Sequence, residues 1–310
     1  MKTLLLLLGI ACALQAAGDS ASRKRDMLWQ KLATRIEKLD QQLDGVLGVA
    51  ILDLTDHREW TYHADEEFPT ASTIKLAVLA ELFHQEQLAR DGKSGNATLK
   101  DRYVVHTRDL VPDSAVLDHL TPEVTVLTNR DLAAAVVAVS DNSASNILTT
   151  RLGMARINQT LDSLGLKQTR LRRQMMDLEA ARQGRENIAT PRELVLLLAA
   201  IYNNQLFRPD LTKDFFNLLS TPKDSSLPRL LPESVKVANK PGELAGVRCD
   251  AGIIFVPGRP FAIAVMTTYD REEHSAANII SQVSLLAWRM FDVFSVSSPY
   301  GRQITERNSH

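Results

Sequence analysis

Strand-forming segments stand near both ends of this chain, and a long stretch with helical periodicity separates them. Apolar, strand-like runs occupy "GVLGVAILDL" and "EWTYHAD" on one side, and "CDAGIIFV" and "FAIAVMTTY" on the other. Between Thr73 and Leu219 the pattern is mostly helical, with loops at "DGKSGN", "LVPDSA" and "RQGREN". This order predicts one antiparallel sheet assembled from distant parts of the chain, with a mostly helical lobe inserted between its halves.

Two amphipathic helices flank the predicted strands. Leucine and isoleucine recur at helical spacing in "RDMLWQKLATRIEKLDQQL", and "HSAANIISQVSLLAWRMFDVF" has the same character near the other end. We therefore expect an α/β (α+β) fold whose sheet carries the terminal helices. A cleft is expected where the inserted lobe meets the sheet, because clefts between lobes are common ligand sites. The predicted parts are a sheet lobe over 27–71 and 230–294, a helical lobe over 72–229 and a flexible polar tail over 295–310.

A short apolar run opens the chain. A positive start precedes "LLLLLGIACAL", and small residues follow it, which is the pattern of a secretory signal. We expect residues 1–17 to be removed, which leaves a single exported domain over 18–310, periplasmic or extracellular. The run is shorter than the roughly 20 apolar residues of a membrane span, so no stable span is expected. Lipidation at Cys12 is disfavoured because Gly9 stands where a large aliphatic residue is needed.

The composition argues against several classes of function. The formal net charge is −1 and no basic block is present, which disfavours nucleic-acid binding. The histidines are scattered and no glycine-rich phosphate loop follows a strand, so we expect no metal, nucleotide or flavin cofactor. Without the leader, Cys249 is the only cysteine, and no intramolecular disulfide can form. No residue pattern sets the oligomeric state, and a monomer is the expectation.

Ser72 and Lys75 stand where a loop gives way to the helix-forming run "IKLAVLAEL". At a helix start, positions i and i+3 share one face, and the first N–H groups are free to stabilise an oxyanion. Lysine acts as a base only when neutral, so its pKa, near 10.4 in water, would have to fall by about 3 through burial and nearby positive charge. A serine cap followed by a solvated lysine explains the pair as well, and Ser220 and Lys223 repeat the same spacing.

Two further motifs carry suitable groups. "VSDNSASN" follows the apolar helix "DLAAAVVAV", so Ser140 and Asn142 can face one cavity, where the hydroxyl relays a proton and the amide binds a substrate carbonyl. In "NKPGEL", Lys240 can supply a second positive charge, and Gly242 lets the backbone approach a ligand closely. Taken alone, each motif also fits a plain turn or a helix cap.

In this order the three motifs resemble the Ser-x-x-Lys, Ser-Asp-Asn and Lys-x-Gly set of class A β-lactamases and penicillin-binding proteins. The segments "TNRDLAAAVVAVSDNSASNILTTRLG", "TRLRRQMMDLEAARQGRENIATPREL" and "GVRCDAGII" also look like that family, and the resemblance covers about residues 27 to 294. It implies a β-lactamase/transpeptidase-like fold and these catalytic roles: nucleophile Ser72, activating base Lys75, proton relay Ser140, and Lys240 as the source of positive potential. It also implies that Asn142 orients the substrate amide and that the backbone N–H groups of Ser72 and Glu243 form an oxyanion hole; Gly242 and Arg248 are further candidate substrate-binding residues.

The first departure from the family pattern lies in the Lys-x-Gly motif. Pro241 takes the place of a threonine or serine, which removes a hydroxyl that would bind the substrate carboxylate. Proline tolerates an edge strand, and the strand lining this cleft would be one. Arg248 on the next strand is a replacement contact, since its fork matches a carboxylate; a solvated arginine explains it as well.

The second departure lies in the loop "TRLRRQMMDLEAARQGREN". Matching "TRL" puts Met175 where the resemblance implies a glutamate that activates water, and Asp177 is the candidate substitute. Arg173 and Asn187 stand where the family often pins this loop with a salt bridge, and these two residues cannot form one. Acylation without fast hydrolysis of the ester is therefore expected.

Three functions fit the sequence. The first is an exported acyl-serine hydrolase of the class A β-lactamase type, which opens the β-lactam amide through an ester on Ser72 and deacylates slowly. The second is a D-alanyl-D-alanine-type peptidase or penicillin-binding protein, and the third is a β-lactam or peptidoglycan sensing module without turnover. The missing glutamate favours the second, and the wider similarity favours the first. The expected partner is a small β-lactam or a cell-wall peptide.

Overall fold

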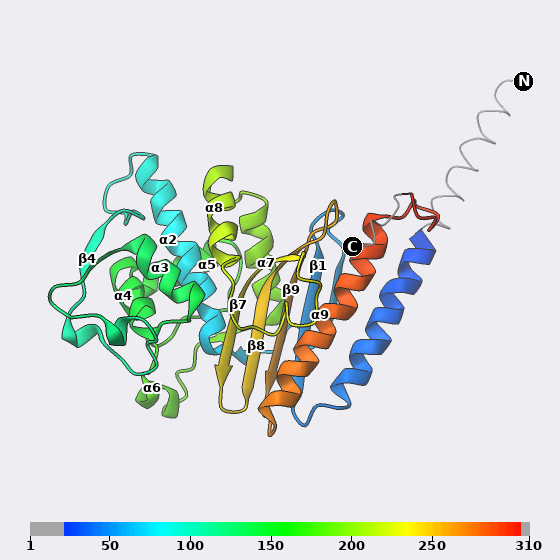
Figure 1. The fold of residues 1–310 in the computed structure, drawn as a ribbon, viewed down its shortest axis with the longest axis horizontal. Helices are drawn as coiled ribbons and strands as arrows, with labels where there is room; N and C mark the ends of the chain where they lie inside the picture. The colour runs from blue at the N-terminus through cyan, green and yellow to red at the C-terminus, as the bar shows by residue number, and fades with distance from the viewer. Residues whose placement is uncertain (1–21, 305–310) are drawn as a thin grey trace, which may run out of the picture.

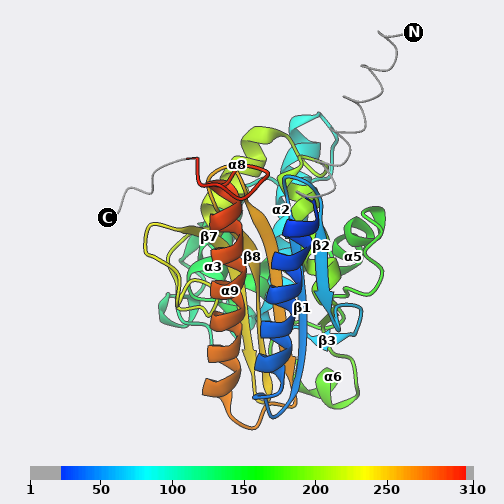
Figure 2. The same ribbon diagram turned by 90° about the vertical axis from the view of Figure 1, so that its right-hand side faces the viewer.

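The structure, a computed structural model, describes residues 22–304. The predicted signal peptide and the lipidation question at Cys12 lie outside this range. An N-terminal helix covers residues 22–40, and α9 (Glu273–Ser295) closes the fold. These two helices lie side by side over one face of the sheet, and the helical lobe covers the other (Figures 1 and 2). In the described part of the chain, no helix is both long enough and apolar enough to cross a membrane.

Five strands form the main sheet in the order β2-β1-β9-β8-β7, and every neighbouring pair is antiparallel. The strands from the two ends of the chain meet where β1 pairs with β9, with Val49 opposite Val265. The prediction of one antiparallel sheet built from both ends is therefore confirmed. The strands are β1 (Val46–Asp53), β2 (Glu59–Tyr62), β7 (Lys236–Leu244), β8 (Val247–Phe255) and β9 (Phe261–Thr268).

Both faces of this sheet are buried, and β9 shows how its sequence allows this. Phe261 and Ile263 pack in the core under the terminal helices, whereas Ala262 and Ala264 pack in the core of the helical lobe. Successive side chains of a strand point to opposite faces, so a continuous apolar run buries two sets at once. Burying a side chain such as Phe261 contributes roughly 2 kcal/mol. The small alanines leave room for α7 (Pro191–Tyr202), which packs on β1 and β9.

The segment inserted between the two halves of the sheet is mostly helical, as predicted. Two short antiparallel strand pairs within the segment between the halves, β3 with β6 and β4 with β5, have no counterpart in the sequence pattern. The remaining elements are η1 (Ala71–Ile74), α2 (Lys75–Arg90), η2 (Thr107–Asp109), η3 (Leu117–His119), α3 (Asn129–Ala138), α4 (Asn142–Leu152), α5 (Met154–Ser163), α6 (Leu178–Arg182), α8 (Pro209–Leu219), β3 (Phe68–Pro69), β4 (Arg102–Val104), β5 (Val126–Thr128) and β6 (Ile188–Ala189).

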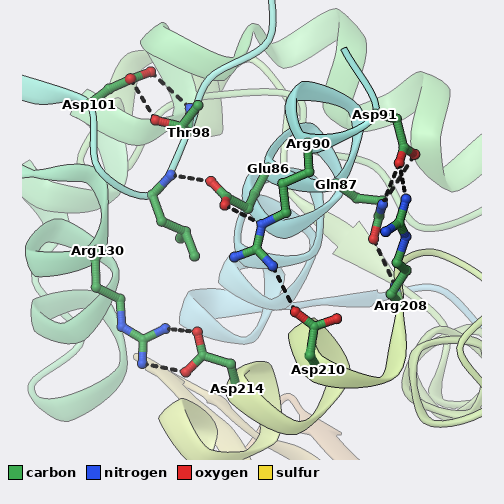
Figure 3. Close-up of polar contacts among 11 residues, drawn as sticks. Glu86, Gln87, Arg90, Asp91, Thr98, Asp101, Arg130, Arg208, Asp210 and Asp214 are labelled. Carbon is green, nitrogen blue, oxygen red and sulfur yellow. Dashed lines mark hydrogen bonds and ion pairs between the residues drawn. The ribbon is translucent and has the colours of Figure 1, made fainter. Parts of the chain in front are cut away.

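Ion pairs join α2, α3 and α8 within the helical lobe (Figure 3). Near the end of α2, Arg90 bonds Glu86 and Asp210 of α8, each at 2.7 Å. Arg130 at the start of α3 forms a bidentate pair with Asp214 of α8, at 2.6 and 2.7 Å. Arg90–Asp210 is exposed and contributes little stability, whereas Glu86 is buried and the bidentate Arg130–Asp214 pair is part-buried, which gives the contact between α3 and α8 a defined geometry.

Part of the predicted tail is described, up to residue 304, and it folds back on itself. Ser297 and Gln303 form an antiparallel bridge, and the N–H of Ile304 donates to the carbonyl of Val296 at 2.9 Å. Lys24 of the N-terminal helix donates to the carbonyl of Tyr300 at 3.3 Å. This part of the tail thus contacts the terminal helix pair.

Candidate active site

Ser72 lies in a single 3-10 turn, η1, which runs directly into α2. The N–H of Lys75 donates to the carbonyl of Ser72, so the two residues are one helical turn apart. The first half of α2, residues 75–83, is buried on every side, because its sequence there is apolar all round except at Lys75 and Glu81. The side chain of Lys75 is consequently enclosed, with 0% of the residue exposed.

Two buried amines meet at one serine. Lys75 Nζ donates to the carbonyl of Ser140 at 2.6 Å, to Ser140 Oγ at 3.2 Å and to Asn142 Oδ1 at 2.8 Å. Lys240 Nζ donates to the same Ser140 Oγ at 3.0 Å and to the carbonyl of Pro241 at 2.8 Å. The hydroxyl of Ser140 therefore connects both amines, which is the arrangement a proton relay needs.

A buried carboxylate holds the turn that presents Ser140 and Asn142. Asp141 caps α4 by accepting the N–H of Ala144 at 2.8 Å, and its second oxygen accepts the N–H groups of Val116 and Leu117, each at 3.0 Å. Ser140 itself has φ 57°, in the left-handed region that side chains rarely adopt. The bonds to Asp141 oppose the roughly 1–3 kcal/mol that such a conformation costs.

Strained backbone gathers around this site. Nine described non-glycine residues have a positive φ, and four of them line one cleft. Backbone strain of this kind persists where the surrounding structure fixes it, and it concentrates at functional sites. The four are Ala71, Asp113, Ser140 and Met176.

The amines are held in environments that favour their neutral forms. Burial lowers the pKa of Lys75 well below its ordinary value, and the positive charge of Lys240 lowers it further. Burial lowers the pKa of Lys240 to about 7, with Asp250 opposing the shift and Lys223 adding to it. Burial and the charge of Lys240 thus shift Lys75 toward the neutral form that a base needs.

A cleft of about 660 Å³ lies between the helical lobe and β7. Gly242 of β7 packs against η1 so closely that a Cβ would fall 2.6 Å from the carbonyl oxygen of Thr70 and 2.7 Å from the N and Oγ1 of Thr73. Only glycine fits there, and β7 is an edge strand, as Pro241 requires. The predicted site residues that line the cleft are Ser72, Ser140, Asn142, Lys240, Gly242 and Glu243.

Besides the fully buried Lys75, two of the predicted site residues do not line the cleft. The guanidinium of Arg248 bonds the carbonyls of Leu244 and Val247, each at 3.2 Å, and lies 3.7 Å from the carboxylate of Glu243. Asp177 is exposed, and its carboxylate accepts the N–H of Ala180 at 2.9 Å as the cap of α6. Neither side chain is directed at Ser72 in this geometry.

Met175 lies in the loop opposite Ser140 and is firmly held. The side-chain amide of Asn146 accepts the N–H of Met175 at 2.8 Å and donates to the carbonyl of Met175 at 3.0 Å. The side chain of Met175 is buried and lines the cleft. Arg173 and Asn187 form no salt bridge with each other, but Arg173 pairs with Glu186 at 2.9 Å instead. Asn187 also accepts the N–H of Arg173 at 3.0 Å. The loop is therefore pinned by Arg173 and Asn187 themselves, through Glu186 and a backbone hydrogen bond in place of a salt bridge between the two.

The sequence reasoning missed the place of Lys223 in this site. It lines the cleft beside Lys240, whereas the sequence offered it only as a repeat of the Ser-x-x-Lys spacing. Ser220, its companion in that repeat, donates to the carbonyl of Phe216 at 2.7 Å and does not line the cleft. A lysine placed just after a predicted helix end, ahead of the strand with Lys240, was the available signal.

A family model described as the β-lactamase enzyme family matches residues 31–291. The chain belongs to this β-lactamase family. A β-lactamase of Streptomyces fradiae is 30% identical over 305 residues, covering 92% of this chain and 94% of that protein. An ancestral class A β-lactamase structure is 28% identical with a TM-score of 0.75, covering 83% of this chain and 99% of that one. The structure of a PBP-A mutant, solved as an acyl-enzyme complex with penicillin G, shares the fold, with a TM-score of 0.75 at 24% identity. The match covers 85% of this chain and 97% of the PBP-A chain.

Members of the β-lactamase family are serine hydrolases that act on amide bonds, and two serines, Ser72 and Ser140, line the cleft of this member. Only Ser72 stands at the start of a helix, where backbone N–H groups are free. Among the described residues, no group of three or more His, Cys, Asp or Glu side chains could hold a metal ion. The groups arranged around Ser72 are amines, a hydroxyl and an amide, which suits acyl transfer to a serine.

Proposed function

We propose that this protein opens β-lactam rings by forming an ester on Ser72 and that it hydrolyses this ester slowly. The proposal is supported above all by one arrangement: Lys75, buried and with a lowered pKa, lies one turn from Ser72 and bonds Ser140 and Asn142. A neutral lysine amine is a competent base for a serine hydroxyl. The names of the relatives agree with a β-lactam substrate.

The steps follow from the positions of these groups. Lys75 takes the proton of Ser72 as its oxygen attacks the β-lactam carbonyl. The C–N bond then breaks, and the ring nitrogen receives a proton from Ser140 Oγ, which is resupplied by the two amines that bond it. The N–H groups of Ser72 and Glu243 stabilise the oxyanion, and each such donor is worth roughly 3 kcal/mol. Asn142 orients the substrate amide, and Gly242 lets it approach β7.

Slow hydrolysis of the ester follows from Met175. A thioether accepts no proton from water, and the side chain occupies buried volume in the cleft wall, where the family's glutamate would stand. Asp177 caps α6 and does not replace that glutamate in this geometry. We therefore infer that the acyl-enzyme accumulates once it forms.

The same observation favours a second candidate, a D-alanyl-D-alanine-type peptidase or penicillin-binding protein. Such proteins need the acylation machinery but have no need of fast hydrolysis of a penicillin ester. The PBP-A mutant solved as an acyl-enzyme with penicillin G shows that a protein of this fold forms such an ester. A sensing module that is acylated without turnover has the same requirements, and Met175 supports it equally.

Intact-mass analysis after mixing with benzylpenicillin tests these functions. We expect an adduct of one penicillin mass that lasts for hours in the wild-type protein and is absent in Ser72→Ala. Rapid release of ring-opened product would contradict slow hydrolysis, and cleavage of a D-Ala-D-Ala peptide would select the peptidase. Absence of any Ser72-dependent adduct would contradict the proposed function.

We also propose that the mature protein is a single exported domain that acts as a monomer. The support for export is the leader pattern in residues 1–17, and cell-wall peptides lie outside the cytoplasmic membrane. Cell fractionation of the full chain, compared with a form that starts at residue 18, tests this. Retention of the full chain inside the cell would contradict it.

A further inference from the structure

Lys223 is a third amine in the cleft, and the steps above do not use it. It follows α8, lines the same cleft as Ser140 and Lys240, and is half-buried. Its Nζ donates to the carbonyl of Leu219 at 2.7 Å and lies 3.4 Å from Asn239 Oδ1. An ammonium group has three donors, so at least one remains for a ligand in the cleft.

No described carboxylate forms an ion pair with Lys223. The nearest buried acid in the same wall, Asp250, has its oxygens engaged by the N–H groups of Ser226 and Leu227 and by the amide of Asn239. Asp224, next in the chain, is exposed and lies 3.5 Å from Arg229. Asp250 attracts Lys223 without touching it, and the exposed Asp224 also lines the cleft. A partly buried cation with no carboxylate in contact still has donors to offer an anionic ligand.

The two candidate contacts for a substrate carboxylate, position 241 from the family resemblance and Arg248 as its replacement, are poorly suited to it in this chain. Pro241 has neither a hydroxyl nor an N–H to donate. Arg248 is engaged by its own hairpin, through the carbonyls of Leu244 and Val247 and the carboxylate of Glu243. Lys223, by contrast, already lines the cleft on the side of Lys240 and Pro241.

We propose that Lys223 binds the carboxylate of the substrate, together with Lys240 and Ser140, and thereby selects acyl donors that carry a free carboxylate. This inference rests on the proposed function and names the anionic substrate class that it takes. Lys223 acts here as a substrate-binding residue in place of the hydroxyl absent from Pro241. The ligand class is a β-lactam or peptide with a free carboxylate close to the scissile amide.

Binding to the Ser72→Ala protein isolates this contact from acylation. The probes are benzylpenicillin and its methyl ester, measured by calorimetry or by competition. We expect Ser72→Ala to bind the acid more tightly than the ester, and the additional change Lys223→Met to weaken binding of the acid about 10-fold, or 1.4 kcal/mol, without changing that of the ester. Lys223→Arg should retain the preference to within about 3-fold, because it keeps the charge.

Lys236→Met is the matched control, since Lys236 is an exposed lysine at the start of β7 that donates to Asn217. It should leave both affinities unchanged. Lys223→Gln is the second variant if Lys223→Met fails to fold, because its amide can keep the bond to Leu219. It should lose the preference for the acid as fully as Lys223→Met does.

The outcomes separate this inference from the proposed function. An unchanged acid-to-ester ratio in both Lys223 variants, or no binding of either probe to Ser72→Ala, overturns the inference. If the wild-type protein still forms a Ser72 adduct in that case, the proposed function stands alone. If no adduct forms but the Lys223 variants abolish a preference for the acid, the anion contact stands and the proposed function falls.

Discussion

The two walls of the cleft differ in the chemistry of their side chains, although buried hydrogen bonds hold the backbone of both. One wall holds the buried amines, at the start of α2, the turn at Ser140 and the strand β7. The other wall is the loop around Met175, which lines the cleft with Met175, Met176 and Leu178 together with Arg173 and Asn187, and with no carboxylate. Both walls are fixed by buried polar bonds, through Asp141 on one side and Asn146 on the other.

This difference separates the two halves of a serine hydrolase cycle. Under the proposed function, the amine wall supplies attack on a carbonyl with a base, a relay and a positive potential. The loop wall carries no proton acceptor near the ester, although its backbone is held as firmly. Slow hydrolysis would then follow from the missing carboxylate at Met175 and not from a loop that is out of place. Changes in the amine wall should affect acylation, and changes in the loop wall should affect release.

The largest effect is expected from Lys75→Met. Methionine has a similar length and suits an apolar environment, so the fold should persist while the base is lost. Acylation by benzylpenicillin should slow by about 10³-fold. Intact-mass time courses measure this rate, and thermal unfolding checks the fold. Lys236→Met, which removes an exposed lysine, should acylate at the wild-type rate; acylation of Lys75→Met within 10-fold of wild type would remove Lys75 as the base.

The next largest effect is expected from Met175→Glu in the loop wall. The clamp by Asn146 holds the backbone of residue 175, so a carboxylate placed there should face the ester. Hydrolysis should accelerate by about 10²-fold, because general-base catalysis contributes that much. The lifetime of the Ser72 adduct is the measurement. Met175→Gln has the same length without the charge and should stay slow; equal lifetimes for the two variants would show that more than a carboxylate is missing.

The sequence predicted the sheet and the lobe because both have local signals. The change from alternating to helical periodicity marks where each begins, and the apolar run of β9 is long enough to be read. The pairs β3–β6 and β4–β5 escaped because each strand has only two or three residues. Strands of that length show no periodicity and exist through their tertiary partners.

For the candidate site, the order of the motifs could be predicted from the sequence, but the partners of each side chain could not. Ser72 and Lys75 share their spacing with Ser220 and Lys223, yet the first pair stands at the start of α2 and the second follows the end of α8. At a helix end the free groups are carbonyls, and both Ser220 and Lys223 bond them. The hydrogen bonds from Arg248 to the carbonyls of Leu244 and Val247 likewise depend on the shape of the turn between β7 and β8, which no residue pattern predicts.

A smaller effect, about 10-fold, is expected from pH. The pKa of Lys240 lies at about 7 and that of Lys223 at about 8, both lowered mainly by burial. Each amine is charged below its pKa, so attraction for a carboxylate should be lost as the pH rises from about 7 to 9. Asp250, in the same wall, has a pKa raised by burial to about 6 and is already ionised over this range. Acylation rates for benzylpenicillin relative to its methyl ester should therefore fall across this window, and a constant ratio would contradict a role for these charges.

The smallest effect is expected from Glu186→Gln, which removes the charge that pairs with Arg173. The guanidinium side is 8% exposed and the carboxylate side 30%, so the pair is only partly screened by solvent. Its loss should lower the free energy of unfolding by about 1 kcal/mol, which corresponds to roughly 2 °C in the melting temperature for a chain of this size.

Glu179→Gln is the control in the same loop wall, because Glu179 and its partner Arg182 are both mostly exposed. It should leave the melting temperature unchanged, since exposed pairs contribute little. Neither variant should alter the lifetime of the Ser72 adduct by more than about 3-fold, because Asn146 holds Met175 independently of Glu186. A shorter lifetime in Glu186→Gln would mean that loop order, and not the side chain at position 175, limits hydrolysis, and the contrast between the two walls would then be one of mobility.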